Sequence, residues 1–341
     1  MHVRFTKTFQ LAAASILLLA AIYVTMIVAK NVRPKKSNLT HIISAAAHES
    51  TLWQAPDTNQ IPLTEDGNLI RYGRELIVNT SCYLGPKGKI ATITNGMNCQ
   101  NCHLDAGTRL WGNNYSAVFS TYPRFRERSG TVENIYKRIN DCTERSLNGK
   151  KLDTNSREML AISAYINWVG FNVPKNVKPE GAGIKNIPLL TRPAEPAKGM
   201  LIYQQKCQRC HGANGEGLLN NDSTSFLYPP LWGKNSYNTG AGLFRLSRFA
   251  GYVSENMPFD APRNAARLTD EEAWDVAAFV NTQPRPQKKI SKDWPDISTK
   301  PFDFPFGPYA DSFPEQQHKY GPFQPIQLLY EKMHGKNIKS H

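Results

Sequence analysis

Acidic residues are scarce in this sequence: 28 aspartates and glutamates stand against 41 lysines and arginines, which gives a formal net charge of +13. Such a charge suits an anionic membrane, a nucleic acid or a small anionic substrate as a partner. However, the chain has no nucleic-acid recognition motif, and its basic residues are spread without a dense basic arm. These absences argue against a nucleic-acid partner.

The sequence also lacks convincing runs of alternating polar and apolar residues, so it predicts few strands and a mainly α fold. Helical spacing is clear in the second half, where Gly199, Tyr203 and Cys207 recur at intervals of four. A second helix there should begin at the capping pair Thr269 and Glu272 and end at a pair of prolines.

The first half of the chain repeats this plan more loosely. One helix is expected over residues 71–79, and a closing helix should begin near Asn155. We therefore predict two helical domains in tandem, over residues 39–175 and 199–286, joined by a proline-rich linker at 176–198.

The N-terminal residues 1–38 have the pattern of an export signal. Arg4 and Lys7 precede an apolar run at 11–29, which is about the length of helix that crosses a bilayer. No small-residue cleavage site follows it directly, so an uncleaved anchor in the cytoplasmic membrane is favoured over a removed signal peptide. Either alternative places the protein in the periplasm, anchored in the first case and soluble in the second.

The C-terminal residues 287–341 are dense in prolines and aromatic side chains. So many large apolar groups would be an aggregation hazard if they stayed in water. We expect this tail to wrap back over the two domains.

Four of the six cysteines fall in two copies of the motif C-x-x-C-H, one in each predicted domain. In this motif the cysteines form thioethers with the vinyl groups of a haem, and the histidine becomes the proximal iron ligand. Two chance matches in one chain are improbable, so we predict two covalently bound c-type haems. Their attachment points and proximal ligands would be Cys99, Cys102, His103, Cys207, Cys210 and His211.

A distal ligand for the second haem can be read from the loop before the closing helix, where small cytochromes c often carry a methionine. Met257 lies twelve residues before Thr269, and it is the only methionine between His211 and Met333. Met257 is therefore predicted to be the distal ligand of the second haem.

The first domain offers no such methionine. Between His103 and His211 there is no other histidine, and Met159 lies inside the closing helix. Cys142, however, stands about as far before its closing helix as Met257 stands before its own. We infer that the Cys142 thiolate is the distal ligand of the first haem.

Three alternatives stay open for Cys142. It could form a disulfide with Cys82, the other cysteine outside the two motifs, in an oxidising compartment. It could stay unligated beside an open iron site, or a lysine such as Lys137 could take the iron instead.

Basic side chains are dense in the sequence around Cys142. Most of them suit a solvated surface, but a few guanidinium groups close to a reactive centre would bind oxyanions better than lysines do. Neighbouring cations would also keep a cysteine deprotonated and nucleophilic. The cluster includes Arg124, Arg126, Arg128, Lys137, Arg138, Arg145 and Lys150.

Six stretches between about Ile61 and Ile326 carry a family resemblance. They are Asn79-Thr80-Ser81-x-Tyr83-Leu84-Gly85-Pro86, Cys99 to Gly107, Ile139 to Lys150, Ser236-Tyr237-Asn238-x-Gly240-Ala241-Gly242, Asn256-Met257-Pro258 and Pro305-Phe306-Gly307-Pro308-Tyr309-Ala310. With them the chain resembles the thiosulfate dehydrogenase/tetrathionate reductase family of dihaem cytochromes c. The resemblance implies oxidation of two thiosulfates to tetrathionate, or the reverse, at a Cys-ligated haem. Electrons would pass through the second haem to an external carrier such as another cytochrome c.

The resemblance also implies roles for single residues. Cys142 would be the axial and reactive cysteine, Arg128, Arg138 and Ser146 would hold the sulfonate oxygens, and Met257 would ligate the second iron. The alternative function is a dihaem electron-transfer cytochrome without a substrate, with His/Met ligation at both haems.

Overall fold

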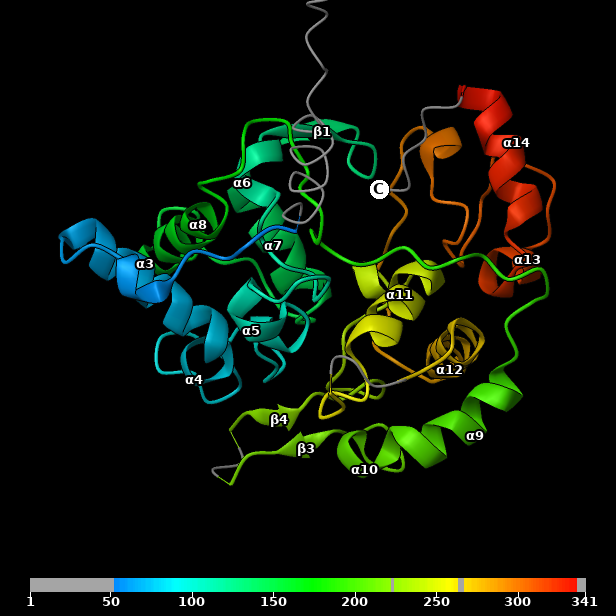
Figure 1. Ribbon diagram of the computed structural model, residues 1–341, viewed down its shortest axis with the longest axis horizontal. Coiled ribbons are helices and arrows are strands. Elements are labelled where there is room, and N and C mark those ends of the chain that lie inside the picture. Colours follow the sequence, from blue (N-terminus) through cyan, green and yellow to red (C-terminus); the bar gives the residue numbers. More distant parts are fainter. Residues whose placement is uncertain (1–51, 222–223, 263–266, 336–341) are drawn as a thin grey trace, which may run out of the picture. The chain divides into compact units, whose positions relative to one another are not determined.

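The computed structural model describes residues 52–221, 224–262 and 267–335 (Figure 1). The membrane helix predicted at 11–29 lies outside the described residues. Among the helices within the described ranges, none is both long and apolar enough to span a membrane.

Helices dominate the described chain, as the sequence predicts. The first repeat contains η1 (Thr58–Gln60), α3 (Glu65–Val78), α4 (Thr80–Leu84), η2 (Cys99–Asn101), α5 (Leu104–Gly107), α6 (Val118–Thr121), β1 (Arg124–Arg126), β2 (Thr131–Glu133), α7 (Ile135–Arg145) and α8 (Arg157–Val169). The second repeat contains α9 (Pro196–Lys206), α10 (Gln208–His211), β3 (Leu218–Leu219), β4 (Phe226–Tyr228), η3 (Gly242–Phe244), α11 (Leu246–Asn256) and α12 (Asp270–Thr282). The C-terminal segment adds η4 (Ile297–Thr299), α13 (Glu315–Tyr320) and α14 (Gln324–His334).

The strands among these elements are short and form two antiparallel pairs, β1 with β2 and β3 with β4. In the first pair Arg124 lies opposite Glu133, and Arg126 lies opposite Thr131. This hairpin leads directly into α7, the helix that carries Cys142.

Helix boundaries follow the capping signals of the sequence. At the start of α12, the Glu272 backbone N–H donates to Thr269 Oγ1 at 3.1 Å, and the Thr269 backbone N–H donates to Glu272 Oε2 at 2.9 Å. This reciprocal capping box confirms the predicted helix start. The start of α8 is one residue later than expected, because Ser156 rather than Asn155 accepts the N-terminal hydrogen bond.

Each repeat is built on one close helix crossing at a glycine. In the first repeat, a Cβ added at Gly73 of α3 would lie 1.9 Å from the carbonyl oxygen of Ala161 in α8. In the second, a Cβ at Gly199 of α9 would lie 1.9 Å from the carbonyl oxygen of Asp275 in α12. The same contact in both halves shows that the two repeats share one helical plan.

Substituting Gly199 by valine is expected to destabilise the second repeat by about 3 kcal/mol or more, because the side chain would force α9 away from α12. Thermal unfolding of the purified holoprotein should show the lowered midpoint. The control is Gly242→Ala, since a Cβ at Gly242 meets no atom within 4 Å. Equal midpoints for the two variants would show that this crossing is not tightly packed.

The C-terminal segment shares a hydrophobic core with the second repeat. Phe323, Ile326 and Tyr330 belong to the same buried cluster as Tyr203 and Trp274. In Figure 1, α13 and α14 are the red helices near the end of the chain. The same segment also reaches the first repeat, where the Trp294 backbone N–H donates to the Arg128 carbonyl oxygen at 2.8 Å.

Candidate functional site

The two C-x-x-C-H histidines are held in the same way. The Nδ1–H of His103 donates to the Asn113 carbonyl oxygen at 2.5 Å, and the Nδ1–H of His211 donates to the Pro229 carbonyl oxygen at 2.9 Å. Burial lowers the pKa of His103 to about 4 and also lowers the pKa of His211, so both rings are neutral. Because each Nε2 makes no hydrogen bond to a described residue, its lone pair is available to a metal.

Met257 lies on the same cavity as His211 and its two cysteines, Cys207 and Cys210. The remaining walls are mainly apolar and aromatic, with Phe249 among them. None of the six cysteines is joined to another in a disulfide, so Cys207 and Cys210 can form thioethers with a haem. A cavity with two thiols, a neutral imidazole and a thioether fits a c-type haem.

The pocket beside His103 brings together the four side chains that the sequence proposes for chemistry. Its walls include Cys142, Arg128, Arg138 and Ser146. Arg138, Cys142 and Ser146 follow one another at intervals of four, and α7 therefore places them on one face. Cys102, the second cysteine of the first attachment motif, also lines this pocket.

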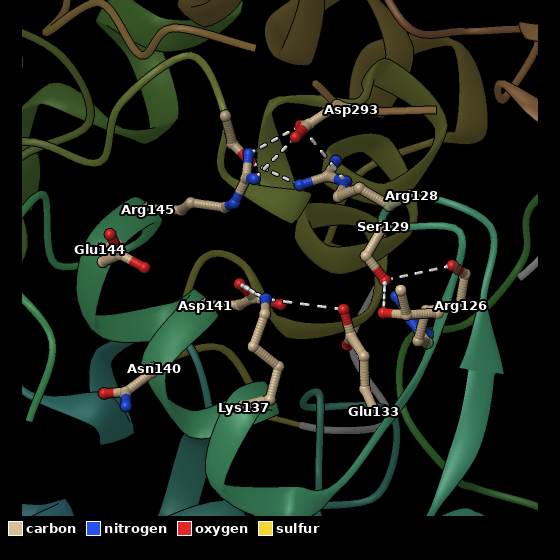
Figure 2. A network of polar contacts seen from close by, with 12 residues as sticks. Arg126, Arg128, Ser129, Glu133, Lys137, Asn140, Asp141, Glu144, Arg145 and Asp293 are labelled. Atoms are coloured by element: carbon tan, nitrogen blue, oxygen red, sulfur yellow. Dashed lines mark hydrogen bonds and ion pairs between the residues drawn. The ribbon is translucent and has the colours of Figure 1, made fainter. Parts of the chain in front are cut away.

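The geometry gives little support to the alternatives to Cys142 as the distal ligand of the first haem. Cys82 and Cys142 are both free, so no disulfide joins them in the described chain. The Lys137 ammonium pairs with the Asp141 carboxylate and lies 3.5 Å from Glu133 Oε1 (Figure 2). An ammonium held by two carboxylates is not directed at an iron.

Positive charge gathers around the pocket from both repeats. The arginines that line it are Arg126, Arg128, Arg138, Arg145, Arg245 and Arg248. Only the first four of these arginines lie near α7 in the sequence. Arg245 and Arg248 come from the start of α11, and the sequence reasoning did not identify them.

One carboxylate, Asp293, organises part of this cluster (Figure 2). Arg145 holds it with both terminal nitrogens, at 2.8 and 2.9 Å, and Arg128 Nε lies 3.9 Å from Asp293 Oδ2. The Arg128 guanidinium also stacks over the Trp294 ring at 4.6 Å. Burial and the neighbouring Arg145 lower the pKa of Arg128 to about 9. Asp293 therefore only partly offsets the crowding of cations.

Cys142 and Arg138 interact electrostatically. Cys142 is the largest cause of the raised pKa of Arg138. The two residues lie one helical turn apart on α7, so the Arg138 guanidinium is placed next to the Cys142 sulfur.

Comparisons with known proteins place both haem-attachment motifs in cytochrome c domains. The family model described as SoxA/TsdA, cytochrome c domain matches residues 89–174, and the model described as cytochrome c matches residues 196–284. The chain is 37% identical over 242 residues to a thiosulfate dehydrogenase from Psychrobacter arcticus, which covers 71% of each chain. It is 40% identical over 200 residues to a thiosulfate dehydrogenase from Allochromatium vinosum, covering 57% of this chain and 72% of that relative. The chain belongs to the thiosulfate dehydrogenase family.

A solved structure supports the family fold. Thiosulfate dehydrogenase (TsdBA) from Marichromatium purpuratum, in its "as isolated" form, superposes with a TM-score of 0.65 at 31% identity over 72% of this chain. The chain spans about half, 52%, of the length of that protein.

This thiosulfate dehydrogenase family member therefore has two cytochrome c domains in tandem, and it carries two c-type haems as the sequence predicts. The residues that would hold the first haem are Cys99, Cys102 and His103, with Cys142 as the candidate on the other side of the iron. Those that would hold the second are Cys207, Cys210, His211 and Met257.

Proposed function

We propose that this protein joins two thiosulfate dianions into tetrathionate, or catalyses the reverse reaction, in the pocket beside Cys142. The observation that carries the proposal is the meeting of Cys142 with His103 and a set of arginines in one pocket. A thiol among cations is suited to sulfur oxyanions, because the cations stabilise both the thiolate and the bound anions.

The chemistry balances with Cys142 as the reacting group. The Cys142 thiolate and the outer sulfur of one thiosulfate form an S–S bond, and two electrons leave. The outer sulfur of a second thiosulfate then attacks the sulfur that bears the sulfonate, and the S–S bond to Cys142 breaks. Tetrathionate leaves, and the Cys142 thiolate is restored. The two bound haems supply one-electron acceptors for these two electrons.

The arginines have a specific task in this proposal. Thiosulfate carries two negative charges, and the repulsion between two such ions and a thiolate rises steeply at short distance. Arg128, Arg138 and Ser146 line the pocket with Cys142 and would hold sulfonate oxygens through charge-assisted hydrogen bonds. They would thereby position the outer sulfur of the first thiosulfate against Cys142.

Electrons would leave through the second haem, for which His211 and Met257 are the proposed ligands. A methionine thioether favours ferrous iron and a thiolate favours ferric iron, so the ligand sets would direct electrons from the first haem to the second. We propose an external carrier such as another cytochrome c, or another high-potential acceptor, as the partner.

The proposed domains are residues 39–175 for the catalytic domain, 176–198 for the linker and 199–286 for the electron-transfer domain, with a wrapping tail at 287–341. We propose a periplasmic location with residues 1–38 providing export and anchorage in the cytoplasmic membrane. Recovery of the native protein from washed membranes supports the anchor; recovery from the soluble periplasmic fraction would instead indicate a cleaved signal.

Mixing the oxidised holoprotein with thiosulfate tests the function. We expect rapid haem reduction together with tetrathionate formation, one tetrathionate for every two electrons.

In Arg138→Gln the apparent KM for thiosulfate should rise by about tenfold to a hundredfold, because one charge-assisted contact is lost. Arg157→Gln, at an exposed position on α8, is the matched control. A wild-type protein whose haems do not respond to thiosulfate would be an electron-transfer cytochrome only.

A further inference from the structure

The cations of the pocket differ in whether a carboxylate neutralises them. Arg128 and Arg145 share Asp293, and Arg245 is paired with Asp303 at 2.7 Å. In contrast, three arginines that line the same pocket form no ion pair with any described residue. These are Arg126, Arg138 and Arg248.

The three guanidinium groups also have few hydrogen-bond partners. Arg248 Nη1 donates to Asn186 Oδ1 at 3.3 Å, which is a long contact to a neutral amide. The side chains of Arg126 and Arg138 donate no hydrogen bond to the part of the chain that the structure describes. Their donor groups are therefore available to a ligand in the pocket.

The three cations lie close enough to repel one another. Burial lowers the pKa of Arg248 to about 10; Arg245, Arg126 and Arg138 contribute to this lowering, and Asp303 opposes it. Burial and then Arg138 lower the pKa of Arg126. Desolvated like charges are costly to hold together, and an anion bound among them would remove that cost.

These three arginines come from different elements of the fold, and only one of them shares a helix with Cys142. Arg138 lies one turn from Cys142 on α7, where it would hold the first thiosulfate of the proposed function. Arg126 is on β1, and Arg248 is on α11 of the second repeat, so neither shares the helix face of Cys142. The reaction itself needs two sulfonate positions, because tetrathionate carries one sulfonate at each end.

We propose that Arg126 and Arg248 form a second sulfonate subsite, which binds the thiosulfate that attacks the sulfur linked to Cys142. The inference rests on the proposed function and adds the binding site of the second substrate. In the attack, one S–S bond forms between the two outer sulfurs while the S–S bond to Cys142 breaks, with no further electrons exchanged. The same subsite holds the far sulfonate of tetrathionate when the reaction runs in reverse.

The test compares the holoproteins Arg126→Gln and Arg248→Gln with the charge-matched control Arg157→Gln. The first S–S bond should still form in the two pocket variants, so intact-mass analysis after thiosulfate addition should show an accumulated Cys142 adduct of one thiosulfate. The KM for thiosulfate should rise by about tenfold to a hundredfold in steady turnover. Arg248→Lys should recover part of the loss, and the control should match the wild type.

Several outcomes would overturn the subsite. If the two pocket variants kept the wild-type KM and accumulated no adduct, the subsite proposal would be wrong. If they kept the wild-type KM but had a shifted haem midpoint potential, these arginines would instead bind haem carboxylates. Equal haem content and equal unfolding midpoints exclude misfolding as a cause of the expected result. If the wild-type protein oxidises thiosulfate and the variants do so equally well, only the subsite proposal is wrong. If the wild-type protein does not react with thiosulfate, the proposed function is wrong as well.

Discussion

Cys142→Ser is expected to lose thiosulfate oxidation by about a thousandfold or more while both haems stay attached. The attachment motifs use other cysteines, so haem content should not change. A serine hydroxyl stays protonated near neutral pH and cannot form the S–S bond on which the proposed cycle depends. Activity is measured as tetrathionate formed with an artificial electron acceptor.

Cys82→Ser is the matched control for this prediction. Cys82 lies on α4, is only partly buried and does not line the pocket of Cys142. It should therefore retain wild-type turnover. A loss of activity as large as that of Cys142→Ser would point to a disulfide between these two cysteines in the working protein.

Asp303→Ala is expected to destabilise the protein by about 3–5 kcal/mol, because it leaves the buried Arg245 charge without its partner. Asp303 is fully buried; it accepts from Arg245 Nε at 2.8 Å, from the Ser247 backbone N–H at 2.9 Å and from Ser247 Oγ at 2.5 Å. These contacts join the C-terminal segment to the start of α11. Chemical denaturation of the holoprotein measures the loss.

The same carboxylate makes a prediction about pH. Burial alone would raise the pKa of Asp303, but the ion pair with Arg245 and the hydrogen bonds from Ser247 lower it overall. A lowered folded pKa stabilises the protein above the ordinary aspartate pKa of about 3.9, and this stabilisation is lost as the pH falls below that value. Asp303→Ala should therefore flatten the acid limb of the stability profile. Asp66→Asn is the control, because the Asp66 side chain is exposed on α3 and forms no hydrogen bond or ion pair with a described residue; if it behaved like Asp303→Ala, the buried pair would not be the cause.

Local signals in the sequence predicted the parts of the fold that local physics determines. The spacing of Gly199, Tyr203 and Cys207 predicted α9, and the Thr269–Glu272 pair predicted the start of α12. Adjacent serine and asparagine are both good N-caps, so the one-residue error at α8 has no deeper cause. One local signal was missed: Glu133 and Asp141 lie four residues before and after Lys137, a spacing that predicts ion pairs with its ammonium group.

The rest of the pocket could not be read from local patterns. Asp293 lies 148 residues from the Arg145 that it binds. Arg245 and Arg248 arrive on a helix of the second repeat, and no spacing rule relates that helix to Cys142. Which cations keep a free charge depends on these distant pairings, so the sequence identified a basic neighbourhood but not its unpaired members.

Electron paramagnetic resonance of the fully oxidised protein addresses the central claim most directly. Our account predicts one low-spin ferric haem with a histidine/thiolate signature and one with a histidine/methionine signature, and only the first should disappear in Cys142→Ser. Two histidine/methionine signatures in the active wild-type protein, unaffected by that substitution, would contradict it.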